Sequence, residues 1–184
     1  MKRLLTSLAV TCVVLGALAS VASATHSNGQ GPDKDFINGT AKLDIDTPFG
    51  TFPSQQHINA QAGPQGNTYT TGKFWTTIFA GPPVFPPGTE EQLSGDVLCL
   101  DANGNDEVDR GLITDSAGPV PVTGLGVMAF HQDNGEPGHG DGNPPDNAQG
   151  FLTPPPGPNP ACPTASPVGG YPVEQGNFIV HDGI

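Results

Sequence analysis

The chain contains 184 residues, of which 18 are acidic and 6 are basic, so its formal net charge at pH 7 is −12. A surface of this sign repels phosphate backbones and anionic lipids, so we expect neither nucleic acid nor a membrane surface as a partner. Glycine (26) and proline (21) are abundant, but they cluster between segments with clear strand patterns. The composition therefore indicates a folded, loop-rich protein and not a disordered one.

Residues 1–24 have the pattern of a secretory signal peptide. The basic start Met1-Lys2-Arg3 precedes an apolar run to about residue 19, and the small residues Ala-Ser-Ala close the segment at Ala24. The run is too short for a membrane span, and no later segment is apolar over about 18 residues. We therefore expect a secreted, extracellular chain with no membrane insertion once the signal is removed.

The mature chain divides into a short terminus and one domain. Residues 25–35 are polar, contain glycine and proline, and are expected to form a flexible terminus. The remaining residues, 36–184, have a length that suits a single β domain.

Strand patterns recur along this domain in chain order. Residues 41–46 alternate apolar and charged side chains, as in a half-buried strand, and residues 68–79 are rich in threonine and aromatic residues. The eight predicted strands span residues 41–46, 57–62, 68–79, 93–100, 108–114, 122–132, 148–152 and 176–181.

The links between these strands indicate the fold class. Asn103-Gly104 lies between two strand patterns and predicts an antiparallel hairpin, because both residues accept a positive φ. The loops at residues 80–91 and 153–172 are too rich in proline for regular structure. No segment has helical periodicity, so we predict an all-β domain, a single antiparallel barrel or sandwich of about eight strands with long Pro/Gly-rich loops.

Cysteine usage predicts a disulfide. Cys12 leaves with the signal peptide, and the remaining pair, Cys99 and Cys162, is most simply a disulfide in an exported chain. Free thiols or a Cys-His metal site are the alternatives, but no CxxC spacing supports them.

Three short segments carry a resemblance to a known group of proteins. They are GDVLCL at residues 95–100, the turn Gly104-Asn105, and DNGEPG at residues 133–138. They resemble a group of small exported bacterial β domains, of largely unassigned function, found after the choice-of-anchor P domain of surface proteins. The resemblance covers roughly residues 36–181 and implies an extracellular β domain, without catalytic residues to transfer. The chain departs from the pattern at residues 139–147 and 153–172.

The loop after the sixth predicted strand is a candidate metal site. Its four carboxylates are hard oxygen ligands of the kind that Ca²⁺ prefers, and its glycines permit tight wrapping. The spacing matches no known calcium loop, so the alternative is a solvated connection built from two turns. The carboxylates belong to Asp133, Glu136, Asp141 and Asp146.

A second acidic segment and the histidines are also candidate metal ligands, but each has a simpler interpretation. The segment DANGNDEVD at residues 101–109 begins like an EF-hand but has Asp106 and Leu112 where glycine and glutamate are required, so the hairpin explains it better. His131 and His139 could join His57 or His181 around Zn²⁺ or Cu²⁺, but their spacing matches no zinc signature. His131 shares parity with apolar neighbours, which favours a core-edge histidine with a hydrogen-bonded ring.

The functional hypotheses follow from these features. No nucleophile motif is present, which favours a secreted non-catalytic binding or structural module with an extracellular protein or glycan partner. Trp75 and Phe79 share one strand face and would line a ligand-binding surface if they are exposed. The alternatives are a calcium-dependent binding module that uses the acidic loop and, third, a hydrolytic enzyme with its site at the barrel mouth. No cofactor other than Ca²⁺ is suggested.

Overall fold

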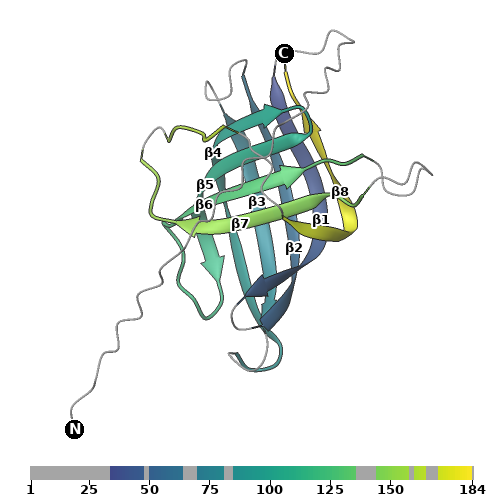
Figure 1. The fold of residues 1–184 in the computed structure, drawn as a ribbon. Helices are drawn as coiled ribbons and strands as arrows, with labels where there is room; N and C mark the ends of the chain where they lie inside the picture. Colours follow the sequence, from purple (N-terminus) through teal and green to yellow (C-terminus); the bar gives the residue numbers. More distant parts are fainter. Residues whose placement is uncertain are drawn as a thin grey trace.

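The chain folds as a closed antiparallel β-barrel in which each strand pairs with its neighbours in sequence order (Figure 1). The computed structural model describes residues 34–47, 50–63, 70–80, 85–135, 144–157, 160–164 and 170–183. Its strands are β1 (Asp35–Thr47), β2 (Gly50–Ala62), β3 (Thr71–Ala80), β4 (Thr89–Asn103), β5 (Asp106–Ala117), β6 (Gly126–Gln132), β7 (Asn147–Thr153) and β8 (Tyr171–His181). The described residues include no helix long and apolar enough to cross a membrane. The predicted all-β class is confirmed, and the barrel is the form that it takes.

The hairpin predicted at Asn103-Gly104 joins β4 to β5. Asn103 pairs with Asp106, so the connecting turn consists of Gly104 and Asn105 alone. Gly104 has a φ of 67°, a conformation that glycine adopts without the steric cost of a Cβ atom. The prediction of an antiparallel hairpin here is confirmed.

The first two strands are longer than their alternation predicted. β1 starts at Asp35, where one carboxylate oxygen accepts a hydrogen bond from the backbone N–H of Gly183 at 3.0 Å. β2 continues through Pro53, which pairs with Asp44 of β1 and lies one residue before the pairing with β3 begins at Ser54. The proline therefore removes no hydrogen bond from the β2–β3 ladder.

The sixth strand is shorter than predicted. β6 begins at Gly126, and the residues before it form a turn in which the N–H of Leu125 donates to the carbonyl of Val122 at 3.0 Å. Gly124 within this turn has a φ of 89°, which explains why the strand pattern does not extend through it.

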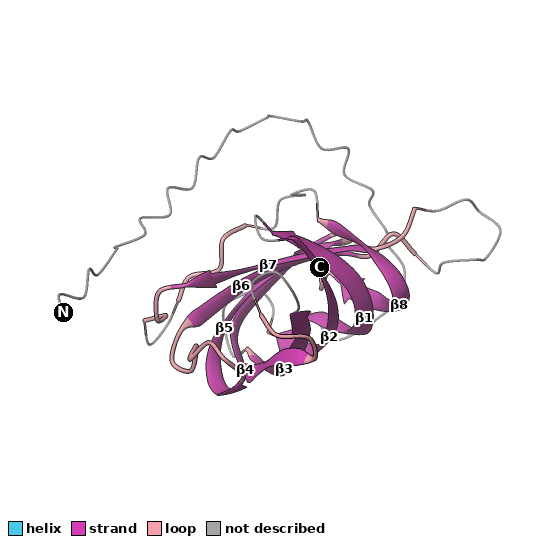
Figure 2. Cartoon of the chain, turned by 90° about the horizontal axis from the view of Figure 1, so that it is seen from below, coloured by secondary structure: helices cyan, strands magenta, loops and turns pink. Residues whose placement is uncertain are grey.

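Alternate side chains of the strands point into the barrel and form its core. Viewed from below, the strands surround a common interior (Figure 2). Period-two alternation places every second residue on this inner face. The buried hydrophobic cluster consists of Ile37, Ala41, Leu43, Ile58, Ala60, Ala62, Phe74, Leu93, Val97, Leu100, Ile113, Val122, Ala148, Val173 and Phe178.

Of the neighbouring strand pairs in the barrel, β7 and β8 have the fewest paired residues. Only Asn147↔Pro172 and Ala148↔Tyr171 pair across it, whereas β8 pairs with β1 from Val173 to His181. The remainder of β7 pairs with β6 alone. We call this short contact the β7–β8 seam.

A disulfide bond links the segment after β7 to β4, on the outer side of the barrel. Cys99 of β4 is bonded to Cys162, with their Cα atoms 5.6 Å apart, so the predicted disulfide is confirmed. The Nη1 of Arg110 on β5 donates a hydrogen bond to the carbonyl oxygen of Ala161 at 3.2 Å. We call this segment, described at residues 154–157 and 160–164, the strap.

Candidate functional site

The barrel encloses a cavity of about 300 Å³ that is partly open to solvent. Its lining is mostly apolar. Every strand contributes to it, as expected where alternate side chains face inward, although β8 contributes only Tyr171 at its start. Phe85, Pro119 and Val120, from the β3–β4 and β5–β6 connections, lie at one end. Eight-stranded barrels have an interior that side chains just fill or that holds one small ligand, and here space remains.

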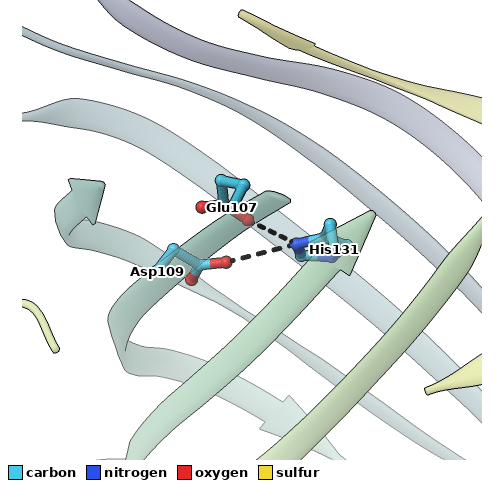
Figure 3. A group of neighbouring side chains, drawn as sticks. All are labelled: Glu107, Asp109 and His131. Carbon is cyan, nitrogen blue, oxygen red and sulfur yellow. Dashed lines mark hydrogen bonds and ion pairs between the residues drawn. The ribbon is translucent and has the colours of Figure 1, made fainter. Parts of the chain in front are cut away.

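Three ionisable side chains, two from β5 and one from β6, meet inside the barrel (Figure 3). Glu107 of β5 pairs directly with His131 of β6, so their side chains point to the same side of the sheet. Asp109 lies two residues further along β5 on that same face. We call these three residues the interior cluster, and Asp109 and His131 also line the cavity.

The imidazole of His131 lies between the two carboxylates. Its Nδ1 is 2.7 Å from Glu107 Oε2, a hydrogen bond, and 3.7 Å from Asp109 Oδ2. The ring of Phe178 packs against the imidazole with centroids 4.6 Å apart. All three cluster residues are at most 5% exposed, so water screens their interactions little.

Burial shifts the ionisation of all three groups toward their neutral forms. It raises the pKa of Glu107 well above its ordinary value of 4.5, and the charges of Asp101 and Asp35 add to the rise. It likewise raises the pKa of Asp109 well above 3.8, with the Glu107 charge adding to the rise and His131 opposing it. The pKa of His131 is lowered from 6.5 by burial, against the attraction of Asp109.

Two oxygen atoms of the cluster have no hydrogen-bond partner among the residues that the structure describes. Glu107 Oε1 and Asp109 Oδ2 are both buried without one. A buried, unpaired acceptor costs about 1–3 kcal/mol, and more when it is charged. The arrangement can therefore accept protons, act as an acid and base pair, or bind a cation.

Asp133 and Asp146, two of the acidic-loop residues proposed for Ca²⁺, make hydrogen bonds to the backbone. Asp133 accepts from Gly135 at 2.8 Å and from Val180 at 3.1 Å. Asp146 accepts from Asn134 and from Phe178, both at 2.8 Å. These bonds join both ends of the loop to β8.

The other two acidic-loop residues, Glu136 and Asp141, lie outside the described residues, as does His139. Calcium binding by the loop from Asp133 to Asp146 therefore stays a prediction.

The aromatic pair on β3 faces away from the cavity. Trp75 is 37% exposed and Phe79 is 41% exposed, so both are available on the outer surface. The Trp75 ring lies 6.0 Å from the ring of His57, and the neighbouring Lys73 forms an ion pair with Asp96. A ligand face at these residues stays a prediction.

The interior cluster was not predicted as a site. Glu107 and Asp109 both lie in the segment at residues 101–109, whose likeness to an EF-hand is better explained by the hairpin. The alternation of β5 does contain a signal for this cluster. Ile113 is buried, and alternate residues of a strand share one face, so the face of Ile113 also carries Gly111, Asp109 and Glu107. The expectation of a hydrogen-bonded His131 near the core is confirmed, with Glu107 as the partner.

No family model matches the chain, and neither a curated protein nor a solved structure does. The fold and its interior therefore define the class: an eight-stranded antiparallel barrel with a mostly apolar cavity and a buried acid–histidine cluster. The resemblance to exported bacterial β domains stays a prediction.

Proposed function

We propose that the chain is a secreted, non-catalytic binding module that takes a small, largely apolar molecule into its barrel. The cavity of about 300 Å³ is the observation that carries this proposal. Ligand pockets are typically apolar concavities of about 300–1,000 Å³ with few polar groups, and this cavity is at the lower limit. The signal pattern at residues 1–24 and the disulfide support export, because disulfides persist in oxidising compartments.

Gly150 provides a variant that tests the cavity directly. It lines the cavity, and a Cβ atom at this position would meet no atom closer than 3.9 Å. Gly150→Leu therefore adds a side chain to the cavity without a backbone clash. Gly157→Leu is the matched control, since a Cβ there meets nothing within 4 Å and the residue lies in the strap, outside the barrel.

The experiment is a fluorescence titration of the mature protein with an uncharged naphthylamine dye. We expect saturable binding of one dye molecule, weakened strongly by Gly150→Leu and unchanged by Gly157→Leu. Absence of binding, or equal binding by wild type and Gly150→Leu, would contradict the proposal. Loss of binding in Gly157→Leu alone would also contradict it and would indicate binding at the separate pocket that Gly157 lines together with Arg110 and Val127.

A hydrolytic enzyme is the second candidate, because two carboxylates and an imidazole converge at the cavity. An acid and a base held together in a pocket are what general acid–base catalysis uses. The apolar lining favours binding over hydrolysis of a polar substrate such as a glycoside. Turnover of ester, peptide or glycoside substrates that Asp109→Asn abolishes would favour the enzyme over the binding module.

A further inference from the structure

The interior cluster has more negative groups than its surroundings compensate. Within the described part of the chain, His131 is the only basic residue that forms an ion pair with Glu107 or Asp109. Arg110, the neighbouring basic residue on β5, instead donates to Ala161 of the strap. Burial favours the protonated forms of Glu107 and Asp109 while the site is empty, so a cation that binds here would release their protons. Once ionised, two buried carboxylates need more positive charge than His131 supplies, because buried charges in proteins are normally paired or coordinate metals.

The spacing of the ligand atoms suits a small divalent ion. One oxygen from each carboxylate and one imidazole nitrogen lie within 4.8 Å of one another. Zn²⁺ binds such atoms at about 2.0–2.2 Å, which places tetrahedral ligands roughly 3.3–3.5 Å apart. The Nδ1–Oε2 distance of 2.7 Å and the Nδ1–Oδ2 distance of 3.7 Å bracket this separation.

We propose that Glu107, Asp109 and His131 form a binding site for a divalent transition-metal ion, of which Zn²⁺ is the prototype. Both carboxylates would be ligands, and their two negative charges would balance the ion. The independent indication of a site is Glu107 Oε1, which is fully buried and has neither a hydrogen-bond partner nor an ion-pair partner among the described residues, while Asp109 Oδ2 has only its ion pair with His131 and no hydrogen bond. Because Asp109 and His131 line the cavity, an ion here would have both a route of entry and a free coordination position facing that space.

The donor set also selects among metals. Ca²⁺ takes 6–8 oxygen ligands, and Mg²⁺ requires an octahedron of oxygens, whereas this cluster offers one nitrogen and two carboxylates. Imidazole with carboxylates suits Zn²⁺ and its first-row neighbours. The site is distinct from the acidic loop proposed for Ca²⁺, and it stands whether or not the cavity takes an apolar ligand.

The test is calorimetric titration of the EDTA-stripped mature protein with Zn²⁺ alone, with Mn²⁺ and Ca²⁺ as parallel titrations. The variants Glu107→Gln and Asp109→Asn preserve side-chain size and remove one carboxylate each. Glu90→Gln is the matched control for removing a carboxylate, because Glu90 is exposed, and His181→Gln tests whether an exposed histidine binds the ion instead. Thermal unfolding of each variant, with and without Zn²⁺, gives a second readout and shows that the variant is folded.

We expect one Zn²⁺ per chain, a higher melting temperature in its presence, and affinity weaker by about 10-fold or more in each amide variant. The two control variants should bind like wild type. The proposal would be overturned by absence of Zn²⁺ binding in wild type, by unchanged affinity in folded Glu107→Gln and Asp109→Asn, or by loss of binding in His181→Gln. The last result would indicate a surface histidine site. A response to Ca²⁺ without Zn²⁺ would point to the acidic loop instead.

Discussion

At the scale of single residues, burial inside the barrel favours the protonated form of a carboxyl group. The pKa of Glu107 is raised well above 4.5, chiefly by burial. The folded chain therefore retains a proton that the unfolded chain releases at about pH 4.5. The stabilising contribution of this proton is fully present below pH 4.5 and is lost as the pH rises through the folded-state pKa.

Glu107→Gln is expected to flatten the pH dependence of stability of the metal-free protein. Relative to the variant, wild type should lose up to about 1.4 kcal/mol of unfolding free energy per pH unit above 4.5, until the folded-state pKa is passed. Urea unfolding in EDTA at several pH values measures this difference. Parallel pH profiles for wild type and Glu107→Gln would contradict the assignment, and Glu90→Gln controls for loss of an exposed carboxyl.

Gly176 is a second position where one residue determines local structure. Its φ is 102°, and a Cβ atom there would lie 1.9 Å from the carbonyl oxygen of Thr40. Gly176→Ala should therefore destabilise the fold by about 2 kcal/mol or more, through both the unfavourable backbone conformation and the clash. Chemical denaturation measures the loss. Gly157→Ala, where a Cβ meets nothing within 4 Å, should change stability by less than about 0.5 kcal/mol.

At the scale of elements, the sequence predicted the structures that depend on interactions between residues close together in the chain. The β4–β5 hairpin was predicted because the Asn-Gly pair favours a tight turn, although the turn itself consists of Gly104 and Asn105 and Asn103 is the last residue of β4. The inward carboxylates of β5 were missed because alternation was interpreted as apolar inside and charged outside. That assumption fails in β5, because the inward face that carries Ile113 also carries Asp109 and Glu107. The ends of β1 and β2 were also missed, since partner strands and not local sequence extend them.

The strap illustrates an element that is held by its covalent link. It contains several prolines and no strand, and the disulfide closes a loop with a sequence separation of 63 residues. Replacing Cys99 and Cys162 together by alanine should cost about 4 kcal/mol in the chain-entropy model. Thermal unfolding measures this cost. A loss below about 1 kcal/mol would mean that the unfolded chain is compact without the bridge.

At the scale of the whole molecule, closure of the barrel could not be predicted from the sequence. A sandwich and a barrel share the same strand patterns, and the difference lies in whether the last strand meets the first. Here Phe36 pairs with His181, far apart in the chain, while the β7–β8 seam has only two paired positions. Closure therefore depends on the β1–β8 ladder, which no local pattern reports.

The seam should be the part of the barrel that opens most easily. Local opening has its lowest free energy where few hydrogen bonds and contacts hold an element. Beyond Ala148, β7 pairs with β6 alone, and Phe151 and Leu152 are exposed beside the cavity. We expect amides of residues 149–153 that face away from β6 to exchange hydrogen much faster than amides in the centres of β1 and β2. Hydrogen exchange followed by NMR resolves individual amides. Because residues 149–152 line the cavity, a bound apolar ligand should slow exchange of their amides. Protection that is equal in β7 and in β1 would place the weakest part of the barrel elsewhere.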